Sequence, residues 1–207
     1  MAQATGSSSL VRSLADSRLY LITAARPDLE EFLGAAVRGG VDIVQIRDSQ
    51  LPDRALLEAL AVARKVTARH RVPLVVNDRP DLALLAGADL VHVGQDDLSV
   101  QDARRIASAV GLSTHTPTQI DDAEADYLGV GPVFATATKP GVSPVGLELI
   151  RYAALHARQP WYAIGGITAA NAAEVVGAGA ERLAVVGAIG DAADPERAAR
   201  ALHALLP

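Results

Sequence analysis

Eight short apolar runs, each followed by an Ala-rich segment of helical character, constrain the fold of this chain most strongly. Each run carries apolar residues on both faces, as strands buried between two other layers do. The runs occupy residues 19–23, 42–46, 74–76, 90–93, 110–113, 127–130, 161–164 and 183–186. A strand followed by a helix, repeated eight times, predicts a parallel sheet covered by helices.

A weak internal repeat sets the size of one strand and helix unit. The segments GGVDIV, AGADLV, AEADYL and AGAERL lead into every second apolar run, and their acidic residues recur about every 46 positions. One unit therefore takes about 23 residues. Gly40, Gly87 and Gly179 suit the left-handed conformation just past a helix end. Eight units nearly fill residues 18–207 and predict a single α/β domain, a (β/α)8 TIM barrel, after an N-terminal segment at 1–17.

An open, doubly wound parallel sheet is the alternative fold. Such sheets usually carry a glycine fingerprint for a nucleotide between the first strand and its helix. The nearest match here, GVGPVF at 129–134, lacks the third glycine and continues into Pro132 instead of opening a helix. The barrel is therefore the favoured fold.

Composition excludes several classes of function. The net charge is −5 and the basic residues are scattered, so we expect no nucleic-acid partner and no membrane partner. The chain has no cysteine, and no apolar run reaches the roughly 18 residues of a membrane span. Residues 1–18 lack the apolar core of a signal peptide. We expect a cytoplasmic protein with residues 1–8 disordered, small-molecule substrates and a possible homo-oligomeric state.

Acidic and amide side chains end two neighbouring strands. In a (β/α)8 barrel, functional residues lie at the carboxyl ends of the strands. Asn77 and Asp78 follow the third run, while Asp96 and Asp97 follow the fourth. Neighbouring strands lie about 4.8 Å apart, so carboxylates from the two loops could converge on one Mg²⁺, with water and a substrate phosphate as further ligands. The alternative is that Asp78 or Asp81 caps a helix at 79–87 and Asp97 caps one at 99–109.

Gln45 and Arg47 end the second strand, in VQIRDSQ. They are two residues apart and share one face of the strand. A guanidinium at this place needs an anion, either an internal carboxylate or a ligand phosphate.

Three glycine-containing loops follow the last strands. AIGGIT at 163–168 and VVGAIG at 185–190 occupy the places where barrels commonly bind phosphate through bare backbone N–H groups. Gly165, Gly166 and Gly187 allow close approach, although either loop could simply be a tight turn. The segment after the sixth strand holds Thr136, Thr138 and Lys139 in a long loop. Its lysine could neutralise a phosphate or be merely solvated.

Ser113 and His115, in LSTHT, end the fifth strand. A serine nucleophile needs a positioned base and an orienting acid, and the sequence supplies no convincing set. We therefore expect Ser113 to form hydrogen bonds rather than to attack. His92, inside the fourth strand, is expected to be a satisfied core histidine.

Taken together, the motifs QIRD, VND, HVGQDD, GLSTHT, GVGPVFATATK, AIGGI and VVGAI resemble those of the thiamine phosphate synthase family in order and spacing, over residues 18–200. The resemblance implies a (β/α)8 transferase that joins hydroxymethylpyrimidine diphosphate to hydroxyethylthiazole phosphate. The products would be thiamine phosphate and pyrophosphate, and the cofactor Mg²⁺.

The resemblance also implies roles for individual positions. The pyrimidine diphosphate would be held by Gln45, Arg47, Asn77, Ser113 and Lys139. The thiazole phosphate would be held by Thr136, Thr138, Gly166, Val186 and Gly187. The catalytic groups would be Arg47, Ser113 and Lys139, and the metal ligands Asp78 and Asp97. Successive strand residues point to opposite faces, so Asn77 and Asp78 can line one site only if the backbone leaves strand geometry near Asp78.

Two positions depart from the family pattern. Ser49, at a substrate-binding position, stands where the family usually has a lysine, so one expected diphosphate contact is absent. Either Lys139 and the metal suffice or activity is impaired. Gly187 stands where a serine is common. Two other functions stay open. A thiazole tautomerase on the same barrel would use a histidine such as His115 to move protons. A non-catalytic phosphate-binding barrel would use the glycine loops alone.

Overall fold

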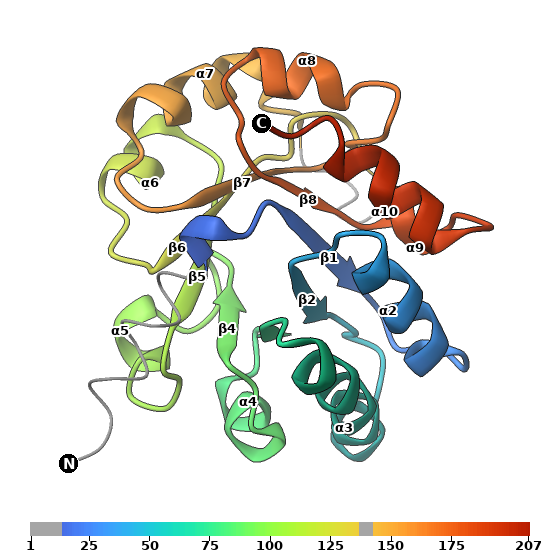
Figure 1. Ribbon diagram of the computed structural model, residues 1–207. Helices are drawn as coiled ribbons and strands as arrows, with labels where there is room; N and C mark the ends of the chain where they lie inside the picture. Colours follow the sequence, from blue (N-terminus) through green and yellow to red (C-terminus); the bar gives the residue numbers. More distant parts are fainter. Residues whose placement is uncertain (1–13, 137–142) are drawn as a thin grey trace.

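The computed structural model describes residues 14–136 and 143–207. Its eight parallel strands form a closed barrel in sequential order, with the last strand pairing back onto the first. Figure 1 shows this ring of strands with the helices arranged around it. The predicted (β/α)8 barrel is confirmed. The disorder expected at residues 1–8 lies outside the described residues.

The strands match the apolar runs to within one residue at each end. They are β1 (Leu19–Thr23), β2 (Ile43–Ile46), β3 (Leu74–Asn77), β4 (Leu90–Val93), β5 (Val110–Thr114), β6 (Tyr127–Val130), β7 (Trp161–Ile164) and β8 (Leu183–Val185). The match follows from burial, because the strands are packed on both faces and are therefore apolar throughout.

A helix follows each strand, and β8 is followed by two. They are α2 (Leu29–Arg38), α3 (Asp53–His70), α4 (Pro80–Ala86), α5 (Val100–Ala103), α6 (Pro117–Asp121), α7 (Gly146–His156), α8 (Ala172–Gly177), α9 (Gly187–Gly190) and α10 (Pro195–His203). The expected helix at 99–109 is shorter than predicted. After α5, the N–H groups of Arg105 and Ile106 bond to carbonyls three residues back, at 3.1 Å each, so the chain tightens into turns. In the described ranges, no helix has the length and apolar character needed to cross a membrane.

Two apolar layers fill the molecule. On β1, Leu19 and Leu21 pack in the cluster that includes the helices, while Tyr20 and Ile22 belong to a second cluster inside the barrel. The interior cluster is dominated by Tyr20, Tyr127 and Tyr162, whose rings meet edge to face with centroids 5.3 to 6.0 Å apart. These rings place large polar-tipped side chains inside the barrel.

The acidic residues of the internal repeat close the amino end of the barrel. Asp42 accepts from the N–H of Leu19 at 3.0 Å, and Asp89 accepts from that of Leu74 at 2.9 Å. Asp126 likewise accepts from the N–H of the first residue of β5 at 2.8 Å. Each of these carboxylates therefore ties the start of an even strand to the start of its odd neighbour. Glu181, at the fourth repeat, instead pairs with Arg182 at 3.3 Å.

The glycines expected past the helix ends have the predicted conformation. Gly40, Gly87 and Gly179 have φ values of 108°, 61° and 108°. Glycine adopts positive φ values with the least strain, which explains its place in three of the four repeats.

Candidate active site

A cavity of about 530 Å³ lies at the carboxyl ends of the strands. The predicted substrate residues that line it are Gln45, Arg47, Ser113, Thr136, Gly166, Val186 and Gly187. They come from β2, β5 and the loops after β6, β7 and β8, so one hollow gathers residues that are far apart in the sequence. Asn77, Asp78, Asp97 and Ser49 are not among its lining residues. Thr138 and Lys139 lie outside the described residues.

Asp78 and Asp97 meet beside this cavity. Asp78 has a φ of 59°, so the backbone leaves strand geometry directly after β3, as predicted. Burial, together with a side-chain hydrogen bond to the Asp97 carboxyl, raises the pKa of Asp78 to about 6, and the nearby Arg47 opposes that shift. Two carboxylates that share a site repel each other unless a proton or a cation lies between them.

Asn77 turns toward this acidic pair. Its side-chain Nδ2 donates a hydrogen bond to Asp78 Oδ2 at 2.5 Å. The amide is therefore engaged with the carboxylate beside it and orients that carboxylate.

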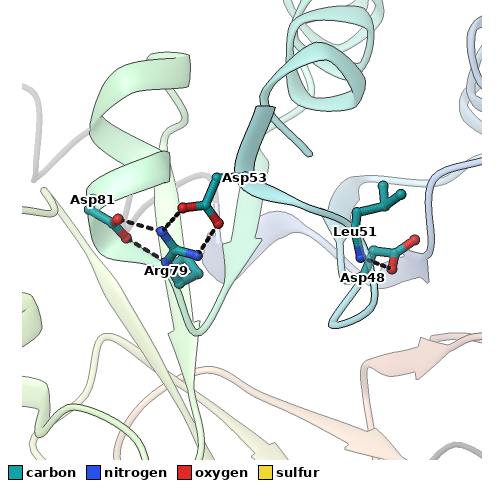
Figure 2. Close-up of polar contacts among 5 residues, drawn as sticks. All are labelled: Asp48, Leu51, Asp53, Arg79 and Asp81. Atoms are coloured by element: carbon teal, nitrogen blue, oxygen red, sulfur yellow. Dashed lines mark hydrogen bonds and ion pairs between the residues drawn. The ribbon is translucent and has the colours of Figure 1, made fainter. Parts of the chain in front are cut away.

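The capping alternative does not hold for Asp78. The residue before α4 is Arg79, and α4 has no side-chain cap. Asp81 pairs instead with the Arg79 guanidinium at 2.7 Å, and Asp53, at the start of α3, binds the same guanidinium at 2.7 Å from the other side (Figure 2). Arg79 thus ties α3 to α4 directly after Asp78, and both of its partners are committed to it.

Asp97 does not cap α5 either. The α5 cap is Ser99, whose hydroxyl accepts from the N–H of Asp102 at 3.1 Å. Asp97 Oδ2 accepts from the N–H of Gly94 at 2.8 Å, which holds the turn after β4. One of its oxygens therefore serves the turn, and the same carboxyl reaches Asp78.

Arg47 has no structural salt bridge to a carboxylate within the described parts of the chain. It lines the cavity and lies near Asp78. The internal ion pair that was the alternative for this residue is not formed at salt-bridge distance, although Arg47 and the Asp78 carboxylate attract each other electrostatically. A guanidinium left in this position is suited to a phosphate ligand.

Ser49 lies on an exposed turn next to Arg47. Asp48 Oδ1 accepts from the backbone N–H groups of Gln50 and Leu51, at 3.0 and 3.2 Å, and Figure 2 shows the second of these bonds. The Ser49 hydroxyl accepts a hydrogen bond from the Gln50 side-chain amide at 3.4 Å.

Gln45 and Ser113 are joined through buried groups that the sequence did not reveal. The Gln45 amide donates to the Tyr20 hydroxyl, and Ser113 Oγ lies 3.0 Å from His92 Nε2. His92 is a satisfied histidine inside the barrel, as predicted, and it also lines the cavity. Hydrogen bonds between side chains of different strands cannot be predicted from the spacing of residues within one strand. The polar residues within the apolar runs were the only sequence signal of these buried contacts.

The glycines after β7 have a packing role. Gly165 and Gly166 have φ values of 104° and 64°. A Cβ at Gly166 would lie 2.6 Å from the Ala135 carbonyl oxygen, so the loop after β6 packs directly onto this turn. Asn171 fixes the turn further, because its Nδ2 donates to the Gly166 oxygen at 2.9 Å. The tight-turn interpretation holds, and both glycines line the cavity as well.

The loop after β8 contains a residue that the sequence did not single out. Val186 and Gly187 line the cavity at the start of α9, and so does Asp191. A Cβ at Gly187 would lie 2.5 Å from Asp191 Oδ2. A carboxylate therefore lies directly beside a loop that was expected to bind phosphate.

His115 lines the cavity in a defined orientation. Its Nδ1 is hydrogen-bonded to the Gly131 carbonyl oxygen, and its backbone N–H donates to Gln119 Oε1 at 2.7 Å. A carbonyl oxygen only accepts, so Nδ1 is the donor of this bond and Nε2 is the nitrogen left for other partners.

The carboxylates offer a metal site of limited size. Within residues 14–136 and 143–207, no group of three or more His, Asp or Glu side chains is arranged to hold a metal ion. The acidic pair alone fits a cation that keeps most of its shell as water and substrate oxygens, which is the habit of Mg²⁺.

Comparison with known proteins identifies the family. The family model for thiamine monophosphate synthase matches residues 19–189. A thiamine-phosphate synthase from Thermus thermophilus is 50% identical, over 90% of this chain and 95% of its own length. One from Gloeobacter violaceus is 48% identical over 89% of this chain, and this chain spans only 56% of that longer protein.

A solved structure agrees with the sequence relatives. The thiamine phosphate pyrophosphorylase from Pyrococcus furiosus superposes with a TM-score of 0.84 and 32% identity, covering 93% of this chain and 96% of that one. Sequence motifs, barrel topology and these comparisons lead to the same conclusion. The chain belongs to the thiamine monophosphate synthase family.

Proposed function

We propose that this chain is a thiamine-phosphate synthase, a transferase that joins hydroxymethylpyrimidine diphosphate to hydroxyethylthiazole phosphate and releases pyrophosphate. Family membership supports the reaction. The observation that carries the proposal is the contact of Asp78 with Asp97, close to Arg47, which lines the cavity. This arrangement combines acidic ligands for a cation with a guanidinium for a phosphate.

We assign Asp78 and Asp97 as the groups that hold Mg²⁺. When bound, the ion would supply positive charge to the departing diphosphate. Asn77 orients the Asp78 carboxylate through its amide. The Gly94 N–H does the same for Asp97. Fixed carboxylates keep the site organised before substrate arrives.

The reaction needs no protein nucleophile. The bond between the pyrimidine methylene carbon and the diphosphate oxygen breaks, and its electron pair leaves with the pyrophosphate. The thiazole nitrogen then donates its lone pair to the methylene carbon to form the new bond. Arg47 lines the cavity and would stabilise the charge of the leaving group. Lys139, outside the described residues, is assigned the same task from the family resemblance.

The pyrimidine ring and the thiazole phosphate would occupy different parts of the cavity. Gln45 and Ser113, from β2 and β5, are assigned to the ring. Thr136, Gly166 and Gly187, from the loops after β6, β7 and β8, are assigned to the thiazole phosphate with Thr138 and Val186. Catalysis would then depend on holding two reactants in one orientation.

Pyrophosphate release tests the proposal. Both substrates are incubated with the full chain, with and without Mg²⁺, and pyrophosphate is measured. We expect release only with the metal and only with both substrates. A chain that releases no pyrophosphate under any of these conditions contradicts the proposal.

One observation favours a second function. His115 lines the cavity with its Nδ1 bonded to the Gly131 carbonyl oxygen, so Nε2 is the ring nitrogen left for the proton transfer that a thiazole tautomerase would need. In the same assay, isomerisation of the thiazole phosphate without metal would identify this activity. A His115→Asn variant that keeps full pyrophosphate release excludes an essential base role. The cytoplasmic location and the homo-oligomeric state stay predictions from the sequence.

A further inference from the structure

A hydrogen-bond network of buried polar groups links the two residues assigned to the pyrimidine ring. Gln45 Nε2 donates to the Tyr20 hydroxyl, and the hydroxyls of Tyr20 and Tyr127 are 3.0 Å apart. His92 Nδ1 lies 3.0 Å from the Tyr127 hydroxyl, and its Nε2 lies 3.0 Å from Ser113 Oγ. Gln45 and Ser113, at the two ends of this network, line the cavity, whereas the two tyrosines between them are buried.

Two glycines leave space for the side chains of this hydrogen-bond network. A Cβ at Gly111 would lie 2.1 Å from Tyr127 Cζ, which no side chain could tolerate. A Cβ at Gly129 would lie 3.3 Å from His92 Cε1. Gly111 of β5 and Gly129 of β6 therefore leave open the space that the rings of Tyr127 and His92 occupy.

The hydrogen bonds have one consistent direction. Burial raises the pKa of both Tyr20 and Tyr127, so each phenol keeps its single proton at neutral pH. Since the Tyr20 hydroxyl accepts from Gln45, the described residues offer its own proton one acceptor, the Tyr127 hydroxyl. Reversing that bond would leave the buried Tyr20 proton without an acceptor among these residues, which is unfavourable.

The same logic continues to the cavity. Tyr127, having accepted from Tyr20, donates to His92 Nδ1. The neutral imidazole then carries its proton on Nε2 and donates it to Ser113 Oγ. Ser113, having accepted, directs its own proton to a ligand, while Gln45 presents its Oε1 as an acceptor.

We propose that Tyr20, Tyr127 and His92 are positioning residues that fix Gln45 as a hydrogen-bond acceptor and Ser113 as a donor toward the pyrimidine ring. The inference rests on the proposed function. An aminopyrimidine presents an amine donor beside a ring-nitrogen acceptor, which complements this pattern. A 4-oxo analogue presents the reverse pattern and should be rejected, because buried polar groups would then face unmatched partners.

Removing one hydroxyl tests the proposal. We compare kcat/KM for the amino substrate and for its 4-oxo analogue in wild type and in Tyr127→Phe. The preference for the amino substrate should fall about 10- to 100-fold in the variant. Tyr162→Phe is the matched control, because its hydroxyl belongs to the same aromatic cluster but bonds to the Leu14 and Ser17 carbonyls. It should keep the wild-type preference.

The opposite result is equally clear. If Tyr127→Phe keeps the wild-type preference while Ser113→Ala loses it, Gln45 and Ser113 act without the buried hydrogen-bond network and the proposal is overturned. Equal loss of preference in Tyr127→Phe and Tyr162→Phe would also overturn it, because general loosening of the interior would then explain both.

A second measurement needs no substrate. In the full chain labelled with ¹⁵N in its histidine rings, the His92 signals, assigned by their absence in His92→Gln, should report the Nε2–H tautomer. An Nδ1–H tautomer overturns the proposed direction. Wild-type protein that releases no pyrophosphate would overturn the proposed function. The His92 tautomer would then by itself decide the direction of the hydrogen bonds in the network.

Discussion

The two ends of the barrel hold carboxylates in opposite surroundings. At the amino end, Asp89 accepts from a strand N–H and pairs with Arg64 at 2.7 Å, and Asp126 does the same with Arg104 at 3.0 Å. At the carboxyl end, Asp78 meets the carboxyl of another aspartate. Asp89 and Asp126 therefore face hydrogen-bond donors and an arginine, whereas Asp78 faces a second carboxyl group.

The difference separates structure from function. A carboxylate with fixed donors stabilises the fold in its charged form. A carboxylate held against another one destabilises its own charged form, and such perturbed groups cluster at functional sites. The comparison leads to predictions in which the same residue type gives opposite results at the two ends.

The largest expected effect is on activity at the carboxyl end. Asp78→Ala and Asp97→Ala should each lower kcat/KM for pyrophosphate release about 10²- to 10³-fold, because each removes a charge that holds the leaving group's counterion. Steady-state kinetics at saturating Mg²⁺ provide the measurement. Wild-type turnover in both variants would remove the metal assignment.

The next effect is on stability at the amino end. Asp126→Ala should lower the free energy of unfolding by about 2 kcal/mol, because the Val110 N–H and the Arg104 guanidinium lose their acceptor. Urea denaturation measures the change, and kcat/KM of the folded variant should stay at the wild-type value. A large loss of activity without loss of stability would break the proposed division between the two ends.

A smaller effect of opposite sign is expected at Asp78. Its pKa is raised from 3.8 to about 6, so its contribution to stability is complete below pH 3.8 and is lost as the pH rises through about 6. Without metal at pH 8, Asp78→Asn should therefore raise the free energy of unfolding by about 1 kcal/mol, a value reduced because the side chain is partly exposed to solvent. Asparagine tolerates the left-handed backbone at this position.

The pH dependence and a control sharpen this prediction. At pH 4 the gain from Asp78→Asn should disappear, because the wild-type carboxyl is then protonated. Asp81→Asn is the control, since the Arg79 guanidinium lowers the pKa of Asp81 and makes its charge favourable to folding. A gain of stability at pH 8 in Asp81→Asn, or a gain in Asp78→Asn that persists at pH 4, would contradict the explanation.

The smallest effect concerns Asp191, another carboxylate at the carboxyl end. Asp191 lies beside Gly187, where the thiazole phosphate is proposed to bind. Asp191→Asn should lower the KM for that substrate about two- to fivefold, by removing an exposed like charge that salt screens in part. The KM for the pyrimidine diphosphate serves as the internal control and should stay unchanged. A higher KM for the thiazole phosphate would show that Asp191 aids its binding.

The sequence predicted the fold because buried parallel strands are apolar throughout. The run at 127–130, for example, coincides with β6 at both ends. The acidic pair was also predictable, since Asp78 and Asp97 follow neighbouring parallel strands and their loops must lie side by side. The alternation of strand residues predicted a departure from strand geometry near Asp78, but not that its backbone would be left-handed.

Other features depend on contacts that spacing does not encode. The hydrogen-bond network from Gln45 to Ser113 passes through residues of β1, β2, β4, β5 and β6, and only closure of the barrel brings them together. The engagement of Asn77 with Asp78 and the place of Asp191 beside Gly187 depend on loop conformations. The shortening of α5 likewise reflects a local tightening of the chain that the apolar pattern did not show.

Calorimetric titration with pyrophosphate tests the central claim most directly. Pyrophosphate is titrated into wild type and into Asp78→Asn, each with and without Mg²⁺. Our account predicts that Mg²⁺ strengthens binding at least about tenfold in wild type and has little effect in the variant. An equal Mg²⁺ effect in both proteins would show that the paired carboxylates do not hold the ion, and would contradict the account.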